Sequence, residues 1–193
     1  MKSFYELEEY ALVKDVPIMQ KEGIEYLIDE LNKRNAESVL EIGSAIGYSS
    51  LMMATHVKGL HVDTIERDEQ RVKEAEENIV KAEVKDKINI YAGDAVEVLP
   101  TLNEKYDVVF IDAAKGKYPF FLKEALRMIK PEGIIFADNI LYKGYVMSDY
   151  NKHKQRTAVR NLREYIKEVS ENPNLETEIL EVGDGLAVSI IKY

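Results

Sequence analysis

The chain has 193 residues, 46% of them hydrophobic and 32% charged, and this composition predicts a single globular domain over residues 1–193. It has no cysteine and three scattered histidines, which excludes disulfides, thiolate zinc sites and cysteine nucleophiles and leaves oxygen ligands for any metal. The formal net charge of −9 argues against nonspecific nucleic-acid binding, and the lack of an apolar run near ~18 residues, with an acidic N-terminus unlike a signal peptide, leads us to expect a soluble, cytoplasmic protein.

Apolar spacing predicts an α/β protein with a Rossmann-like sheet. Residues 4–14 and 18–33 have helical periodicity, the second opening near Pro17, and we expect residues 1–34 to cover the sheet or to form a dimer surface. Strands and helices then alternate, which indicates a seven-stranded, mainly parallel sheet with helices on both faces. A Gly-Asp-Gly hairpin at 183–185 joins the last two strands, so a C-terminal strand is antiparallel. The expected strands are 38–42, 61–65, 87–91, 106–111, 133–137, 176–181 and 186–191; the expected helices are 48–57, 69–82, 95–99, 118–130 and 154–170, with a polar loop over 142–152.

A strand, a glycine turn and a helix start follow one another in residues 39–50, VLEIGSAIGYSS. The glycines, Gly43 and Gly47, are spaced GxxxG rather than in the dinucleotide pattern GxGxxG, and Glu41 would repel a pyrophosphate. A ligand with a cationic sulfonium, an ammonium and a carboxylate suits such a turn, because backbone N–H groups and a carboxylate lie side by side there. S-adenosylmethionine fits this description. The alternative is a turn that only joins a strand to a helix.

Acidic residues stand at or just past the ends of the predicted strands, where ligands bind in open parallel sheets. Glu66 ends the second strand about 20 residues after the glycine turn, the place of the acid that binds ribose hydroxyls in Rossmann-type folds. For Asp94, a helix N-cap is as good an interpretation as a ligand contact.

Three oxygen ligands follow two central strands that should be neighbours. Asp112 ends one strand, and Asp138 and Asn139 end the next. Two carboxylates and an amide carbonyl favour Mg²⁺ with open positions for water and substrate, although solvated or capping acids are the alternative. Lys115 is within reach of the same place; a nearby divalent cation would favour its neutral amine, which can then serve as a base, whereas an exposed surface lysine is the ordinary interpretation.

The motifs VPIM, LEIGSAIGYSS, GDA at 93–95, IDAAKGKY, ADNIL and GDGLAVSIIK together resemble the class I, metal-dependent S-adenosylmethionine O-methyltransferases of the catechol O-methyltransferase type, over about residues 17–192. The resemblance implies Lys115 as catalytic base and Asp112, Asp138 and Asn139 as metal ligands. Small bacterial members similar to this chain include tRNA 5-hydroxyuridine methyltransferases, and other members act on catechols or caffeoyl esters. The cofactor residues that the resemblance implies are Met19, Glu41, Gly43, Tyr48, Ser49, Glu66, Asp94, Ala95 and Asp112.

The mechanism that these residues suggest places a substrate hydroxyl and its neighbouring oxygen on Mg²⁺, with Lys115 taking the proton. The 4-carbonyl and 5-hydroxyl of 5-hydroxyuridine supply the same vicinal oxygens as catechol, so the metal site does not choose between them.

The substrate that accepts the methyl group is predicted from a basic stretch of the sequence. Residues 143–163 have a local charge of +5, which leaves −14 for the rest, and Tyr142, Tyr145 and Tyr150 are interleaved with the basic residues. Cations beside aromatic rings suit an unpaired RNA loop, so we expect methylation of 5-hydroxyuridine at the tRNA wobble position to 5-methoxyuridine, with a catechol or caffeoyl-type acceptor as the alternative. A solvated amphipathic helix also accounts for the pattern. The candidate tRNA contacts are Lys143, Lys154, Arg156 and Arg160.

Apolar residues in the N-terminal segment predict a homodimer, although they could equally pack on their own sheet.

Overall fold

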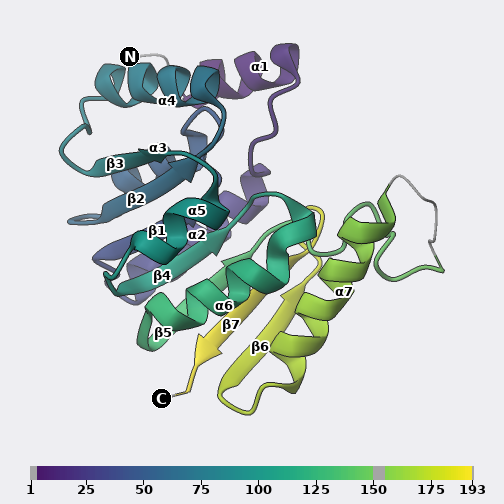
Figure 1. Ribbon diagram of the computed structural model, residues 1–193. Coiled ribbons are helices and arrows are strands. Elements are labelled where there is room, and N and C mark those ends of the chain that lie inside the picture. Colours follow the sequence, from purple (N-terminus) through teal and green to yellow (C-terminus); the bar gives the residue numbers. More distant parts are fainter. Residues whose placement is uncertain (1–3, 150–154, 193) are drawn as a thin grey trace. The chain divides into compact units, whose positions relative to one another are not determined.

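A computed structural model describes residues 4–149 and 155–192 (Figure 1). The chain divides into two compact units, Met1–Leu102 and Asn103–Tyr193, and each is described by itself below. Among the described residues no helix is long and apolar enough to cross a membrane.

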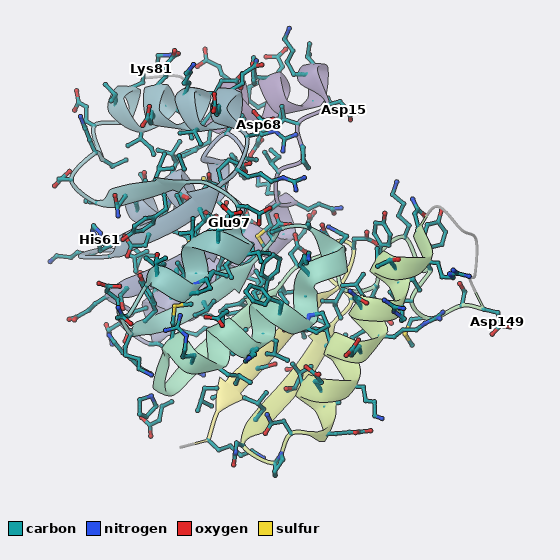
Figure 2. The ribbon with its side chains drawn as sticks, viewed as in Figure 1. Asp15, His61, Asp68, Lys81, Glu97 and Asp149 are labelled. Carbon is teal, nitrogen blue, oxygen red and sulfur yellow. The ribbon has the colours of Figure 1, made fainter. Side chains whose placement is uncertain are left out.

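The first unit contains three parallel strands in the order β3-β2-β1. Its central strands are almost wholly buried, as strands covered on both faces should be. Asp68 begins α4 by accepting hydrogen bonds from the backbone N–H groups of Gln70 and Arg71, and Figure 2 shows Asp68 and Lys81 at opposite ends of this helix. The elements are α1 Phe4–Lys14, α2 Lys21–Lys33, β1 Ser38–Ile42, α3 Tyr48–His56, β2 His61–Glu66, α4 Glu69–Lys81, β3 Ile88–Ala92, α5 Ala95–Val98 and the 3-10 turn η1 Leu99–Thr101.

The second unit contains four strands in the order β4-β5-β7-β6. β4 and β5 are parallel, whereas β7 is antiparallel to both β5 and β6. A hairpin over residues 181–185 joins β6 to β7, and the two strands lie side by side in Figure 1. The elements are β4 Tyr106–Ile111, the 3-10 turn η2 Lys115–Lys117, α6 Tyr118–Met128, β5 Ile129–Ala137, α7 Arg156–Glu171, β6 Leu175–Leu180 and β7 Leu186–Ile191.

With seven strands, mostly parallel and with an antiparallel C-terminal strand, the two units confirm the predicted fold class. The assignment of residues 1–193 to a single methyltransferase domain stays a prediction.

The predicted start of the second helix at residue 18 was wrong, since α2 begins at Lys21. The backbone of Gln20 is extended, and its carbonyl accepts the first hydrogen bonds of the helix, from Gly23 and Ile24. Met19 fits the helical apolar period but precedes the helix, and its buried side chain packs against Gly23, where an added Cβ would lie 2.8 Å from the Met19 methyl carbon. Apolar spacing alone therefore placed the start too early.

The boundary near residue 130 was also wrong, since α6 ends at Met128 and β5 begins at Ile129 instead of residue 133. The pairing with β4 shifts register here, and Glu132 has a left-handed backbone with φ of 62°. A bulge leaves a residue without a ladder hydrogen bond, so Pro131, which has no N–H to donate, is tolerated inside the strand. The turn-like residues 130–133 belong to the start of β5 and do not separate the helix from the strand.

Candidate active site

The predicted glycine turn joins β1 to α3 in the first unit. Gly43, Ala45 and Gly47 have left-handed backbones, with φ of 102°, 46° and 81°. The backbone N–H groups of Gly43 and Ser44 both donate to the carbonyl of Ile65 in β2, at 2.9 and 3.2 Å. An added Cβ at Gly47 would lie 3.2 Å from the Ala75 Cβ, so this position has a steric as well as a conformational reason for glycine.

Glu66 ends β2, and its buried carboxylate fastens the glycine turn. One carboxylate oxygen accepts from the N–H of Ala45, and the other accepts from the N–H groups of Arg67 and Asp68, each at 2.9 Å. A carboxylate has about four lone-pair positions, so one remains for a further donor such as a ribose hydroxyl. The ribose contact itself stays a prediction.

Glu41 is fully buried beneath the turn, in β1. Its carboxylate accepts hydrogen bonds from the hydroxyls of Ser49 and Ser50 in α3, and from Thr64 Oγ1 at 2.6 Å. The structure thus brings together two predicted cofactor residues, Glu41 and Ser49, as partners of each other. Sequence reasoning missed Ser50 and Thr64; the signal for Thr64 was a hydroxyl in an apolar strand, paired in register with Glu41.

The turn has an open place for an anionic group. The Ser44 hydroxyl is buried and has no hydrogen-bond partner in the part of the chain that the structure describes. α3 starts beside it at Gly47 without a side-chain cap, so the first N–H groups of the helix are available to an acceptor. A buried hydroxyl donor and an uncapped helix start fit a ligand carboxylate, such as that of S-adenosylmethionine.

The remaining predicted cofactor residues of the first unit lie in different surroundings. Tyr48 is buried at the start of α3, and its hydroxyl donates to Glu8 of α1 at 2.6 Å; burial and this hydrogen bond raise the pKa of Tyr48. Asp94 is exposed and caps α5 by accepting from the N–H of Val96 at 2.9 Å, which is the N-cap role that its sequence position allows, and Ala95 begins that helix. A cofactor contact stays a prediction for each, as for the buried Met19.

The second unit brings Lys115, Asp138 and Asn139 together at the ends of β4 and β5. The Lys115 ammonium donates to Asn139 Oδ1 at 2.8 Å and lies 5.8 Å from the ring centroid of Tyr142. The N–H of Asn139 donates to Asp138 Oδ1 at 2.7 Å, and the N–H of Asp138 donates to the carbonyl of Ile111, which precedes Asp112.

The two acids are electrostatically strained. Burial and the neighbouring Asp112 carboxylate raise the pKa of Asp138 to about 7. Burial also raises the pKa of Asp112, and the Lys115 ammonium opposes that shift. A hard divalent cation would relieve this repulsion, so the donor chemistry of Asp112, Asp138 and Asn139 fits such an ion. No group of three or more Asp, Glu, His or Cys suited to a metal occurs within residues 4–149 and 155–192, so this set has two carboxylates and one amide.

Two supporting residues of this site were missed by sequence reasoning. The buried Tyr118 hydroxyl donates to the carbonyl of Asp138 at 2.6 Å. The side-chain amide of Asn161 in α7 donates to the carbonyl of Gly116 at 2.5 Å, one residue after Lys115. Tyr118 was visible within the motif IDAAKGKY, whereas no pattern in the sequence marks Asn161.

The predicted basic residues have different roles. Lys143, Arg156 and Arg160 are exposed. Arg163 instead donates to the backbone carbonyls of Tyr145, Val146 and Ser148 and so supports the loop before α7. Three other residues of the basic stretch, Tyr150, Lys152 and Lys154, lie outside the described part of the chain.

Comparison with known proteins identifies the family. A family profile described as O-methyltransferase matches residues 3–192. A catechol O-methyltransferase from Niastella koreensis is 32% identical over 167 residues, which cover 81% of this chain and 74% of that protein. A caffeoyl-CoA O-methyltransferase from Populus kitakamiensis is 29% identical over 190 residues, covering 94% of this chain and 80% of that protein.

Solved structures agree with the sequence comparison. A Staphylococcus aureus protein, described provisionally as a caffeoyl-CoA O-methyltransferase, superposes with a TM-score of 0.92 at 33% identity, covering 99% of this chain and 93% of that one. An O-methyltransferase from Bacillus cereus, solved in complex with SAH, gives a TM-score of 0.87 at 25% identity, covering 98% and 90%. These relatives are catechol and caffeoyl-CoA enzymes or general O-methyltransferases, and the closer resemblance to tRNA 5-hydroxyuridine methyltransferases stays a prediction.

We predict that Thr64→Val lowers the free energy of unfolding by roughly 1–3 kcal/mol, because it removes a donor from the buried Glu41 carboxylate. Urea denaturation measures the change. Thr101→Val is the matched control, since Thr101 is exposed and its hydroxyl donates to the carbonyl of Val98. Equal destabilisation by both variants would contradict the role given to Thr64.

We also predict that the contribution of Asp138 to the stability of the metal-free protein falls as the pH rises from about 4 to about 7. The folded state holds a proton on Asp138 up to about pH 7, whereas an unfolded aspartate loses it near pH 4, so ionisation at higher pH favours unfolding. Asp138→Asn should therefore raise the free energy of unfolding by roughly 1–3 kcal/mol at pH 8, and by much less at pH 4, in urea denaturation with EDTA.

Asp149→Asn is the control for this experiment, because Asp149 is an exposed acid of the same unit (Figure 2). The interpretation fails if Asp138→Asn changes stability equally at both pH values, or if the control behaves in the same way.

Proposed function

The chain belongs to the O-methyltransferase family and is a methyltransferase, and on that premise we propose that it transfers the methyl group of S-adenosylmethionine to a hydroxyl of a small acceptor with two vicinal oxygens, of the catechol or caffeoyl type. The observation that carries the proposal is the grouping of Lys115 and Asn139 with the strained Asp112–Asp138 pair at the ends of β4 and β5. Such a site would hold a divalent cation and would place a base, Lys115, beside one hydroxyl of the substrate.

The glycine turn supplies the groups for the cofactor. The Ser44 hydroxyl and the first N–H groups of α3 would bind the methionine carboxylate, and the free lone pair of Glu66 would accept from a ribose hydroxyl. The buried Glu41, two residues before Gly43, places a negative charge close to the turn, which suits the cationic part of the ligand. The SAH complex of the Bacillus cereus relative supports this choice of cofactor.

In the second unit Asp112, Asp138 and Asn139 would hold the divalent cation, of which Mg²⁺ suits the oxygen ligands best. Bound there, the cation supplies Lewis acidity that makes an acceptor hydroxyl easier to deprotonate. Lys115 is placed by Asn139 and faces Tyr142, and in its neutral form it takes the acceptor proton. Tyr118 keeps the Asp138 backbone in place during this step.

A second candidate acceptor is 5-hydroxyuridine in a tRNA anticodon loop, which presents the same vicinal oxygens. The observation in its favour is that Lys143, Arg156 and Arg160 are exposed, and that Lys143 lies in the chain between Tyr142 and Tyr145, whose rings can stack on bases. Two findings favour the small acceptor instead: the named relatives act on catechol and caffeoyl-CoA, and Arg163 is engaged by backbone carbonyls. The phosphates of a CoA ester could use the same basic residues.

A homodimer remains part of the proposal. In α1, Leu7 and Ala11 are buried within the first unit, whereas Tyr5, Leu12 and Val13 are 73%, 83% and 74% exposed and offer an apolar surface to a second subunit.

We predict that Lys115→Ala lowers kcat by roughly 10²- to 10⁴-fold, the range for loss of a general base, while the Kd for S-adenosylmethionine changes less than about twofold. Steady-state kinetics and calorimetry measure the two quantities. Lys117→Ala is the matched control, an exposed lysine of the same 3-10 turn that should keep wild-type kcat. A parallel loss of kcat and cofactor affinity in Lys115→Ala would mean that the lysine is structural.

We expect methyl transfer to catechol or a caffeoyl ester, and not to tRNA lacking the modification, when the protein is incubated with labelled S-adenosylmethionine and Mg²⁺. For a small neutral acceptor, activity should be insensitive to salt and to Arg156→Glu, because no phosphate is neutralised. Transfer to tRNA that falls steeply with salt and with Arg156→Glu, without transfer to the small acceptors, would replace this proposal by the second candidate. Lys167→Glu, the same charge reversal at an exposed position of α7, is the control.

A further inference from the structure

The loop that follows β5 has an unusual backbone. Three non-glycine residues in five lie in the left-handed region: Asn139 with φ of 56°, Tyr142 with 43° and Lys143 with 57°. Asparagine tolerates this conformation, but tyrosine and lysine seldom adopt it. A backbone of this kind persists only when the surrounding structure fixes it, and such strain gathers at functional sites.

A segment more than forty residues further along the chain fixes this loop. The hairpin between β6 and β7 accepts three backbone N–H groups from it: Ile140 donates to the carbonyl of Gly185 at 3.0 Å, and Leu141 to the carbonyl of Asp184 at 2.9 Å. The third, from Lys143, goes to the Asp184 carboxylate at 2.5 Å. Gly185 itself is left-handed, and an added Cβ there would overlap Leu141, so the two segments are closely fitted.

The loop carries two groups that hold the proposed base. Asn139 accepts a hydrogen bond from the Lys115 ammonium, and the ring of Tyr142 faces the same ammonium. Tyr142 in turn packs edge to face on Tyr145, with ring centroids 5.8 Å apart. Both residues that contact Lys115, Asn139 and Tyr142, have a left-handed backbone. The position of the Lys115 side chain therefore depends on this backbone conformation being maintained.

We propose that Asp184 is a positioning residue for methyl transfer: its carboxylate and its backbone carbonyl hold residues 139–143 in the strained conformation from which Asn139 and Tyr142 orient Lys115. Asp184 does not touch the reacting atoms; it acts through the loop. The role rests on the proposed function of Lys115, but the hold on the loop is a property of the fold and can be measured without any acceptor.

The test compares Asp184→Ala and Asp184→Asn with wild type in the full chain. Asparagine keeps an oxygen that accepts from Lys143, whereas alanine does not. We expect Asp184→Ala to lower kcat roughly 10- to 100-fold, the size of effect that a misplacement of about 1 Å can have, with the Kd for S-adenosylmethionine within about twofold of wild type. Asp184→Asn should recover most of the lost kcat.

Hydrogen exchange provides the readout that needs no activity. In Asp184→Ala the amides of residues 140–143 should exchange faster, the Lys143 amide most of all, while amides of β4 and β5 keep wild-type protection. Glu181→Ala is the matched control, because Glu181 is an exposed acid of the same connection and should change neither kcat nor exchange.

Wild-type kcat in Asp184→Ala, unchanged exchange of the Lys143 amide, or a loss of protection spread over β4 and β5 would each overturn the inference. A wild-type protein that methylates no vicinal-oxygen acceptor, yet shows the predicted exchange difference between the variants, would refute the proposed function and the catalytic part of the inference while leaving the hold on the loop established.

Discussion

The repulsion between two carboxylates at the ends of adjacent parallel strands is the constraint on which the second unit depends. Asp112 and Asp138 follow β4 and β5; burial raises the pKa of both carboxyls, and the Asp112 carboxylate raises that of Asp138 further. Two neighbouring groups stabilise the ionised form of Asp138: Lys115 supplies a positive charge, and the N–H of Asn139 donates to the carboxylate. Such a pair adds nothing to stability by itself, and its presence supports the cation site proposed above.

In the first unit, hydroxyl and backbone N–H donors hold two buried acids, Glu41 and Glu66. Three hydroxyls satisfy Glu41, and three backbone N–H groups satisfy Glu66, so both acids are held rigidly below and beside the glycine turn. Beside them, the buried Ser44 hydroxyl has no hydrogen-bond partner among the residues that the structure describes. Polar groups that are already paired shape the turn, and those left unpaired are the ones a ligand can use.

Much of this could be predicted from the sequence, because strand ends and glycine turns are local features. Alternating apolar segments predicted the sheet, and acids at strand ends predicted Asp112, Asp138 and Glu66. The residues that sequence reasoning missed act across long separations: Thr64 pairs with Glu41, Asn161 reaches Gly116, and the hairpin at Asp184 holds the loop after Asn139. Their residue types are ordinary, so only the folded chain shows what they contact. The methyl acceptor was predicted from charge, but exposed basic side chains do not by themselves define what they bind. The relatives, catechol and caffeoyl-CoA O-methyltransferases, favour a different class of acceptor.

The account depends on an acceptor that offers two neighbouring oxygens to a site with two carboxylates, an amide and a lysine. The most direct test is a rapid-quench, single-turnover measurement of methyl transfer in the presence of Mg²⁺, with catechol compared with phenol at equal concentration. The account predicts that catechol receives one methyl group per active site while phenol receives none, because a single hydroxyl cannot use both oxygen positions of the site. Transfer to phenol at the rate seen with catechol would contradict it.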